Sequence, residues 1–247
     1  MKTLITAIAA VSILATHAFA GDRKFTYSYD VTTAPKGHVE YEQWVTWKAY
    51  RSGAHKDRFD FRHEVEIGLT DKLQLGVYLA DWSLTRQAGN SDSKWTSSGA
   101  ELIYNLSNPT TDLLGSAIYG EVKLGDELFV LEAKLLLQKN VGPWTFVYNA
   151  VVEAEWEGSG YDEEIGVFEQ TLGVSYDLSP AISVGVEAKH EIEYENWSGS
   201  GDSAVYVGPV ASYRQKDFFV AGTVLFQATD IDGEADVQTR VIFGFHF

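Results

Sequence analysis

Strict alternation of apolar and polar side chains over long stretches is the feature that most limits what this chain can fold into. Between Arg58 and Leu69 the odd positions are apolar apart from His63, and the even positions are mostly charged. The same pattern recurs at 144–157 and at 182–194. A period of two collects the charges on one face of a strand, whereas a helix would spread them round its circumference. The chain is therefore expected to be all-β.

The number of alternating segments and the connections between them predict how the strands are arranged. Twelve segments can be counted, at roughly 38–50, 58–69, 73–84, 94–106, 114–124, 127–138, 144–157, 164–177, 182–194, 203–213, 217–229 and 235–247. Short turns such as 70–72 alternate with connections expected to be longer, at 85–93, 158–163 and 195–202. Spans of about ten residues with this alternation are typical of outer-membrane barrels. The prediction is a transmembrane antiparallel up-and-down β-barrel of about 12 strands.

A soluble double sheet is the alternative, and two features count against it. A barrel of more than about eight strands encloses a lumen too wide to fill with an apolar core, so polar groups are wanted inside. Aromatic residues also gather near both ends of the expected strands, as in the girdles of membrane barrels. They are Tyr41, Tyr104, Trp144 and Tyr176 on the short-turn side, and Trp47, Trp95, Trp156 and Tyr194 on the long-loop side.

Composition excludes several classes of function. The chain has 19 Lys and Arg against 35 Asp and Glu, for a net charge of −16, which disfavours a nucleic-acid partner because phosphates need the opposite sign. It has no cysteine, which rules out disulfides, thiolate metal sites and a cysteine nucleophile. Nothing in the sequence indicates a cofactor.

The first twenty residues have the pattern of a secretory signal. Lys2 precedes an apolar run at 4–15, and Ala18-Phe19-Ala20 is a small-x-small cleavage site. We expect residues 1–20 to be a signal peptide, residues 21–37 to be a periplasmic or lumen-facing segment, and residues 38–247 to form the barrel. Cleavage near Ala20 would deliver the protein to the outer membrane of a Gram-negative bacterium.

Two stretches carry a resemblance to known proteins. The last strand places Phe243, Phe245 and Phe247 on one face, with Phe247 as the last residue. It resembles the terminal strand of Gram-negative outer-membrane barrels, and this implies recognition by the barrel-assembly machinery. The segment Thr32-Thr33-Ala34-Pro35-Lys36-Gly37, followed by Glu40-Tyr41-Glu42-Gln43-Trp44-Val45-Thr46-Trp47, resembles the start of an uncharacterised family of predicted outer-membrane proteins. That resemblance implies architecture and location only.

If the apolar face contacts lipid, the charged face lines a lumen. The expected lumen residues are Glu40, Glu42, Arg58, Asp60, Arg62, Glu64, Glu66, Glu101, Glu121, Lys123, Glu132, Lys134, Glu153, Glu155, Glu187, Lys189, Glu191 and Arg240. Together with further inward positions, fifteen acids face seven bases, which favours cations over anions. The hypothesis is a porin-like channel for passive or gated passage of small cationic or neutral solutes. The alternative is a structural or interaction barrel whose charge network closes the lumen.

A catalytic or metal-binding role receives little support from the sequence. A lipid-hydrolysing barrel would need a Ser and His pair on an outward face, but neither His63 nor His190 has a Ser two residues away. The run from Asp230 to Asp236 resembles a calcium loop only in part, and a solvated hairpin turn is the preferred interpretation. No enzyme activity and no metal site are expected, and the expected partners are outer-membrane lipid and lipopolysaccharide.

Overall fold

The computed structural model describes residues 23–52, 55–199 and 201–247, and shows twelve antiparallel strands in one ring. The expected signal peptide lies outside these residues. The strands are β1 Val39–Tyr50, β2 Lys56–Thr70, β3 Leu73–Gln87, β4 Asn90–Ser107, β5 Gly115–Gly125, β6 Leu128–Val141, β7 Trp144–Glu157, β8 Glu163–Ser179, β9 Ile182–Glu195, β10 Ser203–Arg214, β11 Phe218–Gln227 and β12 Val237–His246. The predicted fold class is confirmed.

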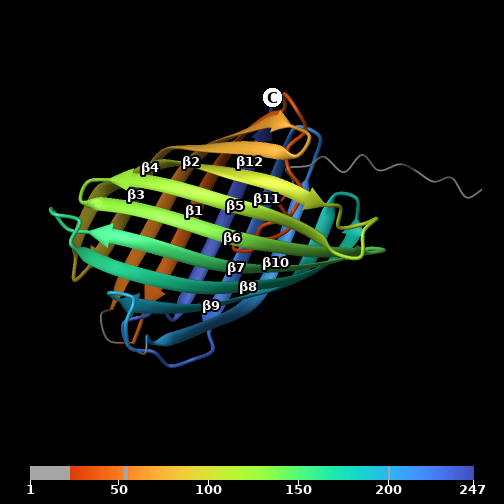
Figure 1. The fold of residues 1–247 in the computed structure, drawn as a ribbon. Coiled ribbons are helices and arrows are strands. Elements are labelled where there is room, and N and C mark those ends of the chain that lie inside the picture. Colours follow the sequence, from red (N-terminus) through yellow and green to blue (C-terminus); the bar gives the residue numbers. More distant parts are fainter. Residues whose placement is uncertain (1–22, 53–54, 200) are drawn as a thin grey trace, which may run out of the picture.

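Each strand pairs with its neighbours in sequence, and the ring closes between the first and the last (Figure 1). At this seam Glu40 of β1 lies opposite His246 of β12, and the register continues to Ala49 opposite Val237. Closure leaves no sheet edge unpaired. No helix long and apolar enough to span a membrane occurs in the described part of the chain.

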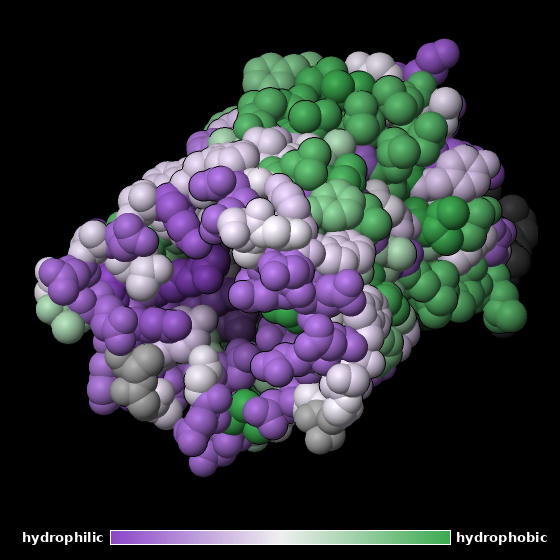
Figure 2. Space-filling view, turned by 60° about the vertical axis from the view of Figure 1, so that its left-hand side comes forward, coloured by the Kyte–Doolittle hydropathy of each residue, from purple (hydrophilic) through white to green (hydrophobic). Residues whose placement is uncertain are grey.

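The alternation in the sequence sorts the side chains between the two sides of the wall. Large apolar side chains on the outside are exposed, among them Leu102, Ile118, Leu135, Val186 and Phe226. The matching inward positions carry buried acids, amides and hydroxyls. Figure 2 shows apolar side chains over the part of the visible outer wall away from the mouth, and hydrophilic ones gathered around the mouth. This is the distribution expected where the outside meets hydrocarbon and the inside does not.

The two ends of the barrel differ in their connections. The turn end, which carries the connections β2–β3, β4–β5, β6–β7, β8–β9 and β10–β11, also carries the C-terminus. The loop end carries the other six connections, and those after β7, β9 and β11 are among its longer ones. The expectation of a longer loop at 85–93 is wrong, because β3 and β4 continue to a two-residue turn. Ala88 and Gly89 both have positive φ, 51° and 82°, which suits the twist of a tight hairpin.

Residues 23–37, here called the plug segment, do not belong to the wall. They lie inside the ring of strands at the turn end, where the red part of the ribbon runs beside the C-terminus in Figure 1. Phe25, Val31 and Ala34 of this segment are fully buried. Gly68 of β2 leaves room for the end of the plug segment to pass, because a Cβ at this position would lie 2.0 Å from the carbonyl oxygen of Pro35.

Candidate functional site

The plug segment pairs with no strand and is held mainly by side chains of the wall, while at its end the backbone nitrogen of Gly37 donates to the carbonyl oxygen of Gly68 at 2.8 Å. The carboxylate of Glu187, on β9, accepts three of its backbone N–H groups, from Thr26 at 3.2 Å, Tyr27 at 2.8 Å and Ser28 at 2.6 Å. Thr223 of β11 donates to the same carboxylate at 2.8 Å. One buried acid thereby satisfies donors that an irregular segment would otherwise leave unpaired in the interior.

Amide side chains continue this role along the segment. Asn149 of β7 accepts from the backbone nitrogen of Tyr29 at 2.6 Å and donates to its carbonyl oxygen at 3.0 Å. Gln138 of β6 accepts from Val31 at 2.9 Å, and Gln74 of β3 accepts from Ala34 at 2.7 Å. The contacts pass from β9 to β3 around the barrel. The plug segment therefore crosses the lumen.

Aromatic and aliphatic side chains of the plug segment pack into three small apolar clusters inside the barrel. Phe25 packs with Val147 and Val210, and it occupies the space above Gly173, where a Cβ would lie 2.5 Å from its ring. Tyr27 packs against Tyr206. The largest cluster contains Tyr29, Val31, Trp44, Ile103, Ala117, Tyr119, Leu136, Phe219 and Ile242. The inward face of the wall is thus partly apolar where the plug segment lies.

Two cations at the start of the segment pair with wall acids. Arg23 bonds to Glu42 at 2.7 Å and to Glu66 at 2.9 Å. Lys24 bonds to Asp177 of β8 at 2.9 Å. Because Glu42 and Glu66 are buried, the pairing with Arg23 offsets part of the cost of removing their charges from water.

Towards the loop end the lumen opens into a charged cavity of about 410 Å³, here called the vestibule. Its floor includes Tyr27, Tyr29 and Trp44, so the plug segment separates it from the turn end. The hydrophilic mouth that comes forward in Figure 2 is hollowed. Nine acids and seven bases line the vestibule, an excess of two negative charges, which is much smaller than the sequence alone suggested.

Neighbouring strands pair most of these charges. Arg62 of β2 makes a two-pronged contact with Asp81 of β3, with Nη2 2.9 Å from Oδ2. The other close ion pairs in the vestibule are Arg58–Asp60 at 2.7 Å, Lys123–Glu121 at 2.8 Å, Lys134–Glu132 at 2.9 Å and Lys189–Glu191 at 2.8 Å. Cations also lie over the floor, since Arg240 is 3.9 Å from the ring centre of Tyr27. The vestibule is a charge network that still holds open space.

The residues expected in the lumen fall into two groups. Twelve line the vestibule, namely Arg58, Asp60, Arg62, Glu121, Lys123, Glu132, Lys134, Glu153, Glu155, Lys189, Glu191 and Arg240. The other six, Glu40, Glu42, Glu64, Glu66, Glu101 and Glu187, are buried outside the vestibule lining, where Glu42, Glu66 and Glu187 hold the plug segment. At the end of the chain, Phe243, Phe245 and Phe247 are exposed, and the backbone nitrogen of Phe247 donates to Val39.

Sequence reasoning missed one vestibule acid and several inward aromatics. By simple alternation along its strand, Asp81 would face outward. A bulge after Tyr78 shifts the alternation by one residue, so Asp81 faces the lumen and pairs with Arg62. Trp44, Tyr78 and Tyr119 lie on inward positions and are buried. Their alternation with acids was visible in the sequence, yet nothing there showed a segment inside the barrel for them to pack against.

The histidines on the outer wall also differ from expectation in one respect. His63 packs beside Tyr41, whose hydroxyl is 2.8 Å from Nδ1. His190 has no Ser two residues away on its own strand, but Nε2 lies 2.8 Å from Ser203 Oγ of β10, and Nδ1 lies 3.2 Å from Gln170 of β8. Searching only at a spacing of two residues missed this pair, because strand register brought the Ser from the neighbouring strand.

Comparison with known proteins gives a family and a fold. Residues 17–240 match the family model described as "Family of unknown function (DUF6662)". None of the curated proteins compared with the chain matches it. Among solved structures, the chain is similar to the NanC porin, with a TM-score of 0.54 and 11% identity over 84% of this chain and 98% of that one.

A second solved structure is similar to the same degree. It is the translocator domain of the autotransporter NalP from Neisseria meningitidis, with a TM-score of 0.53 and 12% identity over 85% of this chain and 88% of that one. At these identities the likeness concerns the fold alone. The fold is that of outer-membrane β-barrels.

Proposed function

This chain belongs to the DUF6662 family of unknown function, and we propose that it is a gated outer-membrane channel for small cationic or neutral solutes. In this proposal the plug segment is the gate and the vestibule is the entrance. The exposed apolar wall supports a membrane location, with lipid and lipopolysaccharide as surroundings. Secretion through residues 1–20 and insertion by the barrel-assembly machinery belong to the same proposal.

The observation that carries the proposal is that the wall closes without the plug segment. All twelve strands pair in a complete ring, and the backbone N–H groups of Tyr27, Ser28, Tyr29 and Val31 bond to wall side chains. Departure of the segment would break those contacts and leave the strand ladder intact. A gate needs this separation, because opening must not unfold the barrel.

The volume and the charge of the vestibule support small cationic or neutral molecules as the solutes. A volume of about 410 Å³ is within the range of small-molecule sites. Its paired Lys, Arg, Asp and Glu side chains leave a small negative excess. No continuous basic track appears among the described vestibule residues that would favour anionic solutes.

Single-channel conductance in planar bilayers tests the gate. Glu187→Ala removes an acceptor shared by three plug N–H groups, and hydrogen bonds to charged groups contribute about 1.5–3 kcal/mol each. We expect openings to become more than about tenfold more frequent than in the wild type. Glu193→Ala is the matched control, because it removes an acid from the same face of β9 at the vestibule rim.

The alternative function is a permanently closed structural barrel, and the dense packing of the plug segment favours it. Deleting residues 23–34 decides between the two. Conductance in the deletion variant and in Glu187→Ala, with rare openings in the wild type, supports gating. If the wild type and Glu187→Ala both stay silent while the deletion variant conducts, the plug segment is a fixed structural element and the gated channel is wrong.

A further inference from the structure

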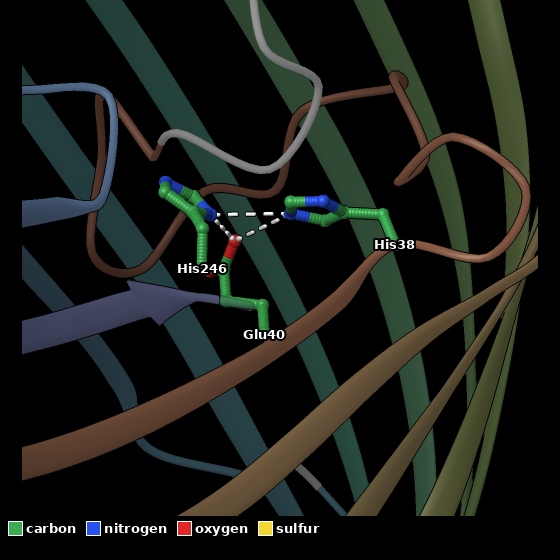
Figure 3. Close-up of side chains that lie close together, drawn as sticks. All are labelled: His38, Glu40 and His246. Atoms are coloured by element: carbon green, nitrogen blue, oxygen red, sulfur yellow. Dashed lines mark hydrogen bonds and ion pairs between the residues drawn. The ribbon is translucent and has the colours of Figure 1, made fainter.

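Three metal-ligating side chains meet at the turn end of the seam, where β1 and β12 close the barrel (Figure 3). His38 immediately precedes β1, Glu40 is its second residue, and His246 is the last residue of β12. His246 Nδ1 lies 2.8 Å from Glu40 Oε2 and 3.2 Å from His38 Nε2, and His38 Nε2 lies 3.9 Å from Glu40 Oε2. The three atoms form a compact triangle.

The size of the triangle fits a tetrahedral metal ion. Zinc binds imidazole nitrogen and carboxylate oxygen at about 2.0–2.2 Å, which places neighbouring ligand atoms of a tetrahedron about 3.3–3.6 Å apart. The three observed separations lie on both sides of that value. Small side-chain rotations that move these atoms by a few tenths of an ångström would place all three within bonding distance of one ion.

The chemistry of the donors points to the same class of ion. Two imidazoles and one carboxylate suit zinc and its neighbours among the divalent transition metals, whereas calcium and magnesium prefer oxygen ligands throughout. With three protein ligands, the fourth position of a tetrahedron is left for water.

The surroundings are rigid and negative. Glu40 and His246 are direct partners in the β1–β12 register, so the backbone fixes the relation between two ligands. The carboxylates of Glu40, Glu42 and Glu66 gather within 4.8 Å of one another, with Arg23 bonded to the latter two. A cation at Glu40 would therefore be attracted by an acid cluster that Arg23 neutralises only in part.

We propose that His38, Glu40 and His246 bind one divalent transition-metal ion of the zinc class, which ties the first strand of the barrel to the last. The ion adds a link between residues more than two hundred positions apart. Binding to the folded state alone stabilises that state by mass action. The proposal goes beyond the gate, since the ligand side chains belong to residues outside the plug segment, although His38 follows that segment directly and its backbone nitrogen donates to Pro35.

Zinc titration of the refolded, chelator-treated protein in detergent tests the proposal. We expect one high-affinity site per chain by calorimetry and metal analysis, and a higher melting temperature with zinc. Cobalt in place of zinc should give the intense visible absorption of a four-coordinate site. His38→Gln and His246→Gln should each weaken binding by at least about 100-fold, with circular dichroism and heat-modified gel mobility confirming that the variants still fold.

His63→Gln is the matched control, because His63 lies on the outer wall beside Tyr41 and should leave zinc affinity unchanged. Zinc affinity should also fall as the solution is acidified, since protons compete for the three ligands. Absence of zinc binding, or binding that survives both His38→Gln and His246→Gln, would overturn the proposal.

Discussion

Glu187 Oε1 lies 2.6 Å from the backbone nitrogen of Ser28, although the two residues are 159 positions apart in sequence. The contact joins an irregular segment to the inward face of β9, in the interior of the barrel. Side-chain acceptors of this kind let a chain without secondary structure occupy a closed lumen. The hydrogen bonds of the plug segment to Glu187 are therefore separate from those of the strand ladder.

The space above Gly173 offers a second way to displace the plug segment. Gly173→Ala would place a Cβ 2.5 Å from the ring of Phe25 and 2.7 Å from Val147, and packed interiors cannot absorb such an overlap without movement. We expect faster protease cleavage between residues 23 and 37 and more frequent channel openings. Gly120→Ala is the control, because a Cβ there meets nothing within 4 Å. Equal cleavage rates in the two variants would contradict this account of the packing.

The outward wall should be sensitive to charge according to depth. Val184 is 39% exposed on the outside of β9, and an Arg there would face hydrocarbon. We expect Val184→Arg to lower the free energy of unfolding by about 2–4 kcal/mol in lipid vesicles, measured by urea titration. Ser91→Arg, on the exposed start of β4, should cost less than about 1 kcal/mol. Similar costs at the two positions would mean that the wall does not face lipid.

Ion selectivity should depend on the state of the plug segment. The vestibule has only a small negative excess, whereas Glu40, Glu42, Glu64 and Glu66 lie buried beyond it. Deleting residues 23–34 removes Arg23 and Lys24 and opens a path past these acids. Reversal potentials in a potassium chloride gradient should show weak cation preference in wild-type openings and stronger preference in the deletion variant. Anion preference in the deletion variant would show that the path avoids the buried acids.

The contact between His190 and Ser203 should not support ester hydrolysis. A serine nucleophile needs N–H donors for the oxyanion, and the backbone N–H of Val205, two residues along β10, already donates to Thr229 at 3.1 Å. We expect no phospholipid hydrolysis and no labelling by a fluorophosphonate probe. Labelling that disappears in Ser203→Ala but persists in Ser212→Ala would instead establish an active serine on the wall.

Local periodicity determined most of the barrel. Because side chains on a strand alternate strictly between two faces, runs such as 58–69 and 182–194 specified which residues face the lumen and which face outward. Twelve such runs and an even strand number then favoured closure. The boundaries agreed within a few residues, except where β3 and β4 continue to the turn at Ala88 and Gly89.

Tertiary structure decided what occupies the lumen and which residues meet at the seam, because those features depend on contacts that no local pattern encodes. The plug segment has no periodicity to specify where it docks, and its site exists only when β3, β6, β7 and β9 face one another. A bulge in β3 shifted the alternation of faces by one residue and so turned Asp81 into the lumen. His38 and His246 become neighbours because the ring closes, and ring closure joins the two ends of the sequence.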